Sequence, residues 1–282
     1  MKFSYDFFFL INFVFTALAE NSANSSVVKI AYRAAWEIPE TNFSRLGLFY
    51  CRIPKNGSTL MKIVLCDLYR YFKRISFTPK FTRDEEISEC QLQNWYEKVK
   101  LLKKPRWELR QKRELVKFSV IRHPIDRFVS LYGHFCEQLK YCGETNIEIF
   151  ARDLYNLMSN GWKNSTANGK IFIHARQLIY YHAQPQFWFC NFPLEIENYH
   201  LVHHNFDGET MKSELQMVFD EAAVPRKYSN KVLQHVTNST TGNAMRDGKR
   251  RNDHRKNVES NLETMRYLRA IYHSDFELFE YS

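Results

Sequence analysis

The stretch Tyr50–Val64, YCRIPKNGSTLMKIV, decides the fold, because an apolar run breaks at Pro54–Gly57 and resumes as an amphipathic run. The residues before the break, Leu46–Arg52, are mostly apolar and predict a buried strand. The residues after it predict a helix from Ser58 to about Phe72, since apolar side chains recur every four positions at Leu60, Val64, Leu68 and Phe72. A strand that turns through a glycine loop into a helix can bind a phosphate group, because the free N–H groups and the dipole of the helix attract an anion.

The loop between this strand and this helix carries side chains that suit an anion. Gly57 permits positive φ and a close approach of the backbone to a ligand. Ser58 and Thr59 offer hydroxyl donors at the helix start, and Lys55 adds a positive charge. The loop is not the nucleotide-triphosphate motif GxxxxGKS or GxxxxGKT, since Lys55 precedes Gly57. Taken by itself, the loop is interpreted equally well as an ordinary strand–turn–helix with a surface lysine.

A second strand–turn–helix pattern occupies Lys117–Phe135, KFSVIRHPIDRFVSLYGHF. Leu115–Ile121 predicts the strand, and the helix is expected to continue to about Phe135. Arg122 closes the strand and Ser130 follows eight residues later inside the helix, so a guanidinium group and a hydroxyl could converge on one phosphate. The alternative is structural, with Arg122 paired to Asp126 to stabilise the turn.

The composition is that of a globular protein, since 44% of the 282 residues are hydrophobic and 25% are charged. This length is sufficient for one large α/β domain. The net charge of +9 favours acidic partners such as nucleic acid, an anionic membrane or a polyanionic substrate. The net charge alone does not distinguish among these partners, so the cellular compartment has to be considered as well.

The N-terminal sequence MKFSYDFFFLINFVFTALAENSAN has the layout of a secretory signal peptide. Phe7–Ala19 is apolar, ends in a small-x-small pattern and is shorter than the about 20 apolar residues of a membrane span. We expect a signal peptide at residues 1–19, a polar lumenal segment at 20–45 and one folded domain at 46–282. An uncleaved signal anchor is the alternative. Either one places the chain in the lumen of the secretory pathway, which argues against nucleic acid as a partner.

Cysteine usage and glycosylation sequons agree with a lumenal location. The six cysteines contain no CxxC pair, so zinc is not indicated, and an even number in an oxidising compartment suggests disulfides. Cys136 and Cys142 are close enough in sequence to form a local bridge. If the first loop binds phosphate, Asn56 should carry no glycan, because a glycan would block the loop. Sequons occur at Asn24, Asn42, Asn56, Asn164 and Asn238.

The remaining elements alternate along the chain. Tyr199–His203 is expected to be a short strand, and Thr237–Lys256 is polar and basic and is expected to be a mobile loop. Strands that alternate with helices predict a single α/β domain with a central parallel sheet flanked by helices. Further helices are expected at Ile147–Met158, Ile171–His182, Glu209–Ala222 and Asn257–Tyr272.

The ordered pair of motifs, PKNGST at 54–59 and RHPIDRFVS at 122–130, resembles the two cofactor sites of sulfotransferases. Within that family the chain resembles the Golgi carbohydrate sulfotransferases that include the chondroitin 4-O- and HNK-1 enzymes, which use 3′-phosphoadenylyl sulfate (PAPS). The resemblance implies a P-loop-like, PAPS-binding domain over residues 46–282. It implies that Arg122 and Ser130 hold the 3′-phosphate of PAPS. It also implies that the 5′-phosphosulfate is held by the first motif, namely Pro54, Lys55, Asn56, Gly57, Ser58 and Thr59.

The likeness covers most of the chain. Tyr181–Gln186, followed by Cys190, resembles a His-x-x-Pro segment that precedes a cysteine in many members, and Leu268–Tyr281 resembles the closing helix of the family. Vertebrate members commonly read PKVACTNW where this chain reads PKNGSTLM, so the loop looks like that of a divergent, invertebrate member. This departure bears on the acceptor and not on the donor, since Lys55 and the hydroxyl residues remain.

Sulfuryl transfer requires positioning and charge stabilisation, as phosphoryl transfer does. Lys55 is the candidate for stabilising the bridging oxygen as the S–O bond breaks. His182 is the leading candidate for the base, since imidazole titrates near neutral pH, and His174 could share its helix face. A structural role for these histidines, with a carboxylate as the base, is the alternative. No metal is expected.

Two basic segments, Lys103–Arg113 and Lys249–Lys256, are either solvated faces or part of a groove for an anionic glycan. Lys249–Arg251 could instead close over the nucleotide as a flap. The sequence thus predicts a lumenal, Golgi-type, PAPS-dependent carbohydrate O-sulfotransferase, secreted or membrane-anchored, with a chondroitin-type glycosaminoglycan as acceptor. The alternatives are a non-catalytic glycan-binding paralogue and an ATP-dependent phosphotransferase, although a phosphotransferase would need Mg²⁺ carboxylates that are not evident.

Overall fold

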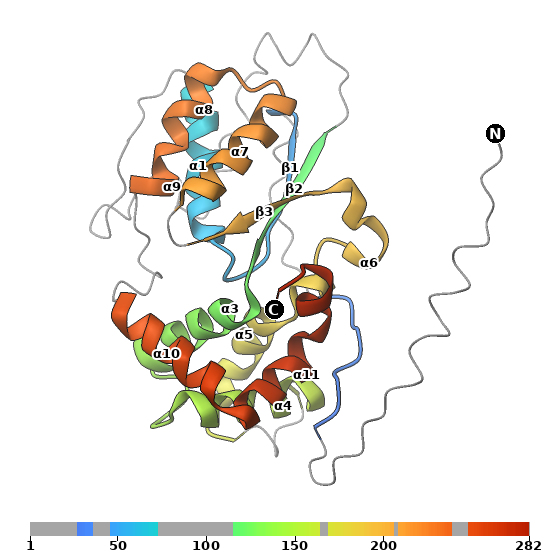
Figure 1. Ribbon diagram of the computed structural model, residues 1–282, viewed down its shortest axis with the longest axis vertical. Coiled ribbons are helices and arrows are strands. Elements are labelled where there is room, and N and C mark those ends of the chain that lie inside the picture. Colours follow the sequence, from blue (N-terminus) through green and yellow to red (C-terminus); the bar gives the residue numbers. More distant parts are fainter. Residues whose placement is uncertain are drawn as a thin grey trace, which may run out of the picture.

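A computed structural model describes residues 27–35, 46–72, 115–163, 169–205, 208–238 and 248–281. Its centre is a parallel sheet of three strands in the order β1 (Leu48–Cys51), β2 (Val116–Arg122) and β3 (His200–His204). The middle strand, β2, aligns Phe118 with Tyr50 of β1 and with His200 of β3. The predicted α/β fold with a central parallel sheet flanked by helices is confirmed (Figure 1).

One face of the sheet packs on the helices in the upper half of Figure 1, which are α1 (Ser58–Phe72), α7 (Glu209–Glu221), α8 (Arg226–Val232) and α9 (Gln234–Asn238). The helix α1 has the predicted bounds, and two of the positions that predicted it, Val64 and Leu68, are fully buried. Side chains alternate between the faces of a strand, so every second residue of the sheet points to these helices. The buried residues of this face are Leu48, Tyr50, Phe118, Val120 and Val202.

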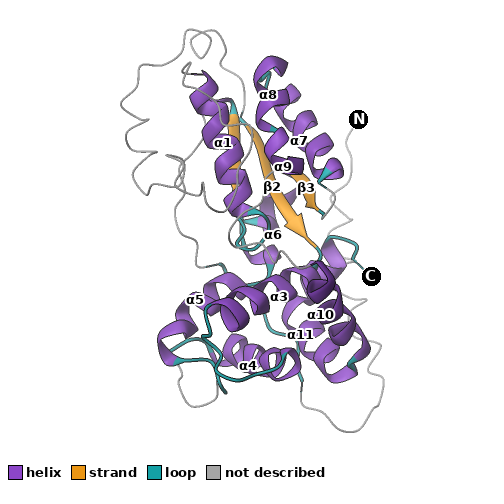
Figure 2. Cartoon of the chain, turned by 90° about the vertical axis from the view of Figure 1, so that its left-hand side faces the viewer, coloured by secondary structure: helices purple, strands orange, loops and turns teal. Residues whose placement is uncertain are grey.

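A second group of helices lies beyond the carboxyl ends of the strands, and Figure 2 shows the arrowhead of β2 pointing into it. These helices pack around a separate apolar core that includes Phe128, Phe150 and Leu268. The segment 27–35 lies alongside α11, and the N–H of Ile30 donates to the carbonyl of Ala270 in that helix at 3.0 Å. The group consists of α3 (Pro124–Tyr132), a π-helix (Gly133–Gln138), α4 (Ile147–Asn160), α5 (Ile173–Ala183), α10 (Gly248–Ser260) and α11 (Leu262–Leu278).

The segment after α5 covers the other face of the sheet. It contains a 3₁₀-helix at Gln186–Trp188, α6 (Phe192–Glu195) and a second 3₁₀-helix at Ile196–Asn198. A disulfide between Cys51 and Cys190 fastens this segment to the end of β1. A second disulfide, Cys136–Cys142, confirms the predicted local bridge.

Part of the predicted mobile loop is helical, because Gly248–Lys256 lies in α10. Contacts distant in sequence stabilise this helix. Arg255 pairs with Asp126 of α3 at 2.7 Å, and Arg250 pairs with Glu137 of the π-helix at 2.6 Å. The sequence pattern could not reveal these ion pairs, since it contains little apolar periodicity in this stretch.

The single helix expected at Asn257–Tyr272 is two helices, because the chain leaves the helical conformation at Asn261. The side chain of Asn261 accepts a hydrogen bond from the N–H of Thr264 at 2.9 Å and so caps α11. The predicted signal peptide at 1–19 and the basic segment 103–113 lie outside the described residues. Among the described residues, no helix combines the length and the apolar character that crossing a bilayer requires.

Candidate functional site

The two predicted phosphate loops lie next to each other because they follow neighbouring parallel strands. Residues 53–57 follow β1 and His123 follows β2, so both loops are at the carboxyl edge of the sheet, where ligands bind in open α/β sheets. Nη1 of Arg122 donates to the carbonyl of Lys55 at 3.0 Å, across 67 residues of sequence. The fold therefore brings the two motifs into direct contact.

The first loop adopts a backbone that suits an anion cradle. Lys55 and Gly57 have positive φ values of 67° and 74°, so the chain turns sharply before α1. A Cβ on Gly57 would lie 2.7 Å from Cδ2 of His204, at the end of β3, so this position requires glycine. Ser58 and Thr59 are half-buried in the first turn of α1, where backbone N–H groups have no partner within the helix. The loop thus presents N–H and hydroxyl donors at the positive end of the helix dipole.

Gln186 joins the two loops from a fully buried position. Its Oε1 accepts hydrogen bonds from Nδ2 of Asn56 at 2.5 Å and from the backbone N–H of Arg122 at 2.9 Å. Its Nε2 donates to the carbonyl of Arg122 at 2.8 Å, and its backbone N–H donates to Asp275 at 2.9 Å. Gln186 therefore fixes the positions of the first loop, the second loop and α11 relative to one another. Sequence reasoning missed this role.

The side chain of Asn56 points into the protein. It is fully buried, and its Nδ2 also donates to the carbonyl of Val120 at 2.7 Å. Asn56 thus positions the first loop, because its Nδ2 donates to both Val120 and Gln186. The sequon at Asn56 has no room for a glycan in this fold, which agrees with the expectation that the residue carries none.

Arg127 connects the first loop to α5 and was also missed by sequence reasoning. Its Nε donates to the carbonyl of Pro54 at 3.0 Å, and its Nη2 donates to the carbonyl of His182 at 2.9 Å. Its Nη1 is buried and has no hydrogen-bond partner among the described residues. The available signal was an arginine directly before the apolar pair Phe128 and Val129, within a helix that also contains Ile125.

Positive charge accumulates where the two loops meet. Burial, followed by the charges of Arg122 and Arg127, lowers the pKa of Lys55 to about 7. Burial also lowers the pKa of Arg122 to about 10, an effect that Asp126 opposes and Arg251 reinforces. Cations that are buried together repel each other and are poorly hydrated, so the cluster favours the binding of an anion.

His182 lies next to this cluster, at the end of α5. Its ring centroid is 5.2 Å from that of Phe135, and Nζ of Lys55 is 5.9 Å from the same Phe135 ring. Nδ1 of His182 lies 2.8 Å from the carbonyl of Leu178. Since a carbonyl only accepts, Nδ1 carries the proton and Nε2 keeps a lone pair. Burial lowers the pKa of His182 to about 3, and the charge of Lys55 acts in the same direction, so the ring is neutral at pH 7.

The other predicted residues are distributed around this site. Ser130 is half-buried in α3, in the turn that follows Arg127. His174 lies on the same helix as His182 but is exposed, two turns away from the cluster. The π-helix beside α3 carries His134, whose pKa is lowered by burial and by the charge of Lys55. Such π-helical segments occur frequently at functional sites, and periodicity in the sequence does not reveal them.

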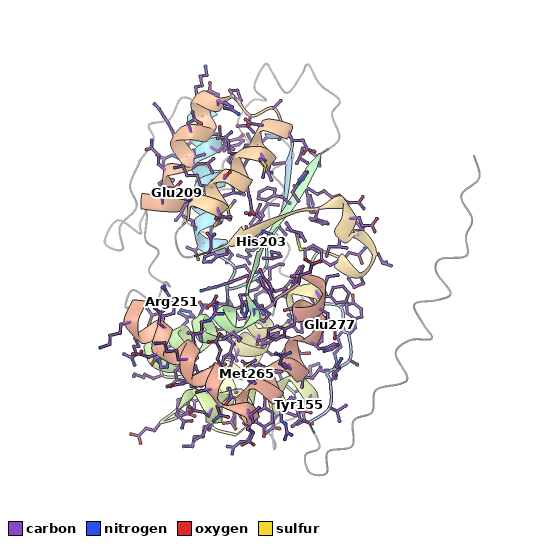
Figure 3. The ribbon with its side chains drawn as sticks, viewed as in Figure 1. Tyr155, His203, Glu209, Arg251, Met265 and Glu277 are labelled. Atoms are coloured by element: carbon purple, nitrogen blue, oxygen red, sulfur yellow. A yellow bond between two sulfur atoms is a disulfide. The ribbon has the colours of Figure 1, made fainter. Side chains whose placement is uncertain are left out.

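The helix α10 places Arg251 near the second motif. The charge of Arg251 lowers the pKa values of both Arg122 and His204. Figure 3 shows Arg251 at the end of α10 that lies nearest the sheet. The predicted flap Lys249–Arg251 is therefore the end of a helix, which the Arg255–Asp126 pair fastens to α3.

Comparisons with known proteins agree with this geometry. Residues 43–282 match the model of the sulfotransferase family. The chain is 25% identical over 264 residues to carbohydrate sulfotransferase chst-1 of Caenorhabditis elegans, covering 86% of this chain and 77% of that protein. It is 26% identical over 209 residues to the putative sulfotransferase vep-2 of the same organism, covering 68% of this chain and 62% of that protein. No solved structure matches the chain significantly. With its two strand-end motifs in contact and the family model covering nearly all of the folded part, this chain belongs to the sulfotransferase family.

Proposed function

We propose that this protein transfers the sulfuryl group of PAPS to a hydroxyl group of a glycan, with a chondroitin-type glycosaminoglycan as the acceptor. The observation that carries the proposal is the cluster of half-buried Lys55 with buried Arg122 and Arg127, whose guanidinium groups donate to the carbonyls of the loop before α1. PAPS has a phosphosulfate group and a separate 3′-phosphate, and the two adjacent loops offer separate cations for them. A glycan acceptor is supported by the name of the relative chst-1, and an acidic one by the net charge of +9.

The residues present fit such a donor. Gly57 lets the first loop turn with a positive φ directly against the His204 ring, and Nη1 of Arg127 is a buried donor without a partner among the described residues. Lys55, with Ser58 and Thr59 at the helix start, would hold the 5′-phosphosulfate. Arg122 of the second loop, with Ser130 of α3, would hold the 3′-phosphate.

When it is bound, the donor supplies the sulfuryl group and the phosphate that leaves. Lys55 stabilises the negative charge that develops on the bridging oxygen, and the N–H groups of Ser58 and Thr59 bind the 5′-phosphate. An anion beside Lys55 raises its pKa again from about 7, so the ammonium form is kept during the reaction. Among the described residues, no cluster of His, Cys, Asp or Glu is placed to hold a metal ion, and these steps need none.

His182 is the residue we assign as the base for the acceptor hydroxyl. Its Nε2 lone pair is available at neutral pH, because Nδ1 holds the proton against the Leu178 carbonyl. In the free protein the pKa of about 3 makes the ring a weak base. An anion bound at Lys55 offsets the nearby positive charge and strengthens the ring as a proton acceptor.

The lumen of the Golgi is the compartment that this function requires. The disulfides Cys51–Cys190 and Cys136–Cys142 support it, since disulfides persist in the oxidising secretory pathway and are rare in the cytosol. The protein would be secreted through this pathway or held in its membrane by an N-terminal anchor.

The experiment that tests the proposal is a thermal-shift titration of the secreted protein with adenosine 3′,5′-bisphosphate, compared with ADP and with Mg-ATP. A ligand at about 100 times its Kd stabilises the folded state by about 2.7 kcal/mol. We expect stabilisation by the bisphosphate, its loss in Arg122→Ala, and its retention in Arg266→Ala, which removes an exposed arginine of α11. A preference for Mg-ATP would indicate a phosphotransferase instead.

Replacing Lys55 with Ala distinguishes an enzyme from a glycan-binding paralogue. Turnover of labelled PAPS should fall by orders of magnitude in Lys55→Ala, while glycan binding changes little. A paralogue without catalysis would show no turnover in the parent protein on any acceptor of a panel that contains desulfated chondroitin.

A further inference from the structure

A continuous surface leads from His182 outward along one face of α5. His174, Leu178 and His182 are four residues apart, so they lie above one another on the same side of the helix. The exposed fraction increases along this face: His182 is half-buried, Leu178 is 42% exposed and His174 is exposed. Figure 2 shows α5 at the edge of its helical group.

Aromatic rings border the same surface. Phe135 lies beside His182, and the ring of Tyr141 follows with its centroid 6.4 Å from that of Phe135. The ring of His174 is 5.2 Å from Tyr141, and the ring of Phe172 is 5.7 Å from His174. Phe135 is 1% exposed and Phe172 is 43% exposed, so the row of rings begins inside the site and ends in solvent.

The segments that carry these rings are held rigidly. The N–H of Tyr141 donates to the carbonyl of Phe135 at 2.8 Å, and the N–H of Phe172 donates to the carbonyl of Tyr141 at 3.0 Å. The disulfide Cys136–Cys142 closes the loop between the first two rings. A preformed surface binds a ligand at a lower entropic cost than a mobile loop does.

The chemistry of this surface matches that of an acidic sugar chain. The C–H faces of pyranose rings are apolar and pack flat on aromatic rings and aliphatic side chains, and contiguous exposed apolar side chains mark binding sites. Lys140, exposed in the loop that the disulfide closes, adds a cation for a uronate carboxylate. The surface also begins at the residues assigned to the reaction, which an acceptor hydroxyl has to reach.

We propose that the surface formed by Tyr141, Phe172, His174 and Leu178 is the binding subsite for an acidic acceptor glycan, which would run along α5 toward His182. This inference rests on the proposed sulfotransferase function and extends it. It assigns acceptor recognition to α5 and to the disulfide-closed loop, apart from the two donor loops.

The test compares Phe172→Ala, His174→Ala and the double variant with the parent protein. Both residues lie on the surface, so folding should be preserved. Met217→Ala is the matched control, since Met217 is 61% exposed on α7 in the other helical group. Kinetics are measured with PAPS and the best acceptor of a panel of desulfated chondroitin, heparosan and N-acetyllactosamine chains. We expect the double variant to raise the acceptor KM at least about fivefold, with an unchanged KM for PAPS and an unchanged Tm.

A second variant tests the charge. Lys140→Gln should raise the KM for desulfated chondroitin and leave the KM for its carboxyl-reduced form unchanged. An acceptor KM that stays at the parent value in the double variant, or that Met217→Ala raises equally, overturns the subsite. If the proposed sulfotransferase function is wrong, the parent protein itself will not be stabilised by adenosine 3′,5′-bisphosphate, or will sulfate no acceptor of the panel. This outcome is distinct from failure of the subsite.

Discussion

Replacing Gln186 with Leu should destabilise the protein strongly, because this side chain holds the two phosphate loops together. The substitution keeps a similar volume, so little cavity forms. It removes the acceptor for Asn56 Nδ2 and for the Arg122 N–H, and the donor for the Arg122 carbonyl. A net hydrogen bond contributes about 1 kcal/mol, and a buried polar group left without its partner costs about 1–3 kcal/mol. Asn56 keeps its bond to Val120, and the backbone N–H of residue 186 keeps Asp275, so we expect a loss of about 3–4 kcal/mol.

Urea unfolding of the oxidised protein measures this loss as a change in the free energy of unfolding. Gln177→Leu is the matched control, since Gln177 is exposed on α5, and its effect should stay within about 0.5 kcal/mol. A double-mutant cycle with Asn56→Ala should give a coupling energy of about 1 kcal/mol or more for the Asn56–Gln186 contact. A loss below about 1 kcal/mol in Gln186→Leu, or additive effects in the cycle, would refute the assignment of Gln186 as the link between the loops.

Three other predictions concern the donor loops. Because the pKa of Lys55 is lowered to about 7, binding of adenosine 3′,5′-bisphosphate should weaken by up to about tenfold per pH unit above pH 7, as calorimetry can measure. The stability of the free protein should rise over the same range, since the unfolded chain holds the proton that the folded Lys55 has lost; Lys55→Arg, which stays charged, should flatten both profiles. Gly57→Ala should abolish bisphosphate binding and lower the Tm more than Gly143→Ala does. Both glycines have positive φ, but a Cβ would lie 2.7 Å from its nearest neighbour at Gly57 and 3.6 Å at Gly143. Equal effects of the two substitutions would contradict the close packing of the first loop against His204. Arg251→Gln should weaken bisphosphate binding about tenfold and Lys256→Gln should not, as titration of each variant will show.

The shape of the first loop explains why its residues divide into two kinds. Ser58 and Thr59 are half-buried in the first turn of α1, whereas Asn56 is turned inward to Val120 and Gln186. A strand-end loop of this kind needs residues that donate to a ligand and residues that hold the backbone. Donor groups bind a ligand well only if the backbone that carries them is held in place. Variants at Asn56 should therefore alter both stability and binding.

The sequence by itself determined the elements whose stabilisation is local. The four-residue spacing of apolar side chains fixed α1 as Ser58–Phe72, and the strand–turn–helix pattern located β2 within one residue at each end. The small separation of Cys136 and Cys142 indicated their disulfide. Both motif loops could also be recognised, because the residue types that bind an anion are contiguous in each of them.

Only the tertiary structure decided how these parts act together. Gln186 reaches Arg122 across 64 residues and Asp275 across 89, and Arg255 reaches Asp126 across 129. Such contacts leave no periodic trace in the sequence, since each is a single polar pair and its geometry is set by the packing of two separate apolar cores. For the same reason the pKa values of Lys55 and His182 follow from burial and from neighbouring charges, which exist only after the chain has folded.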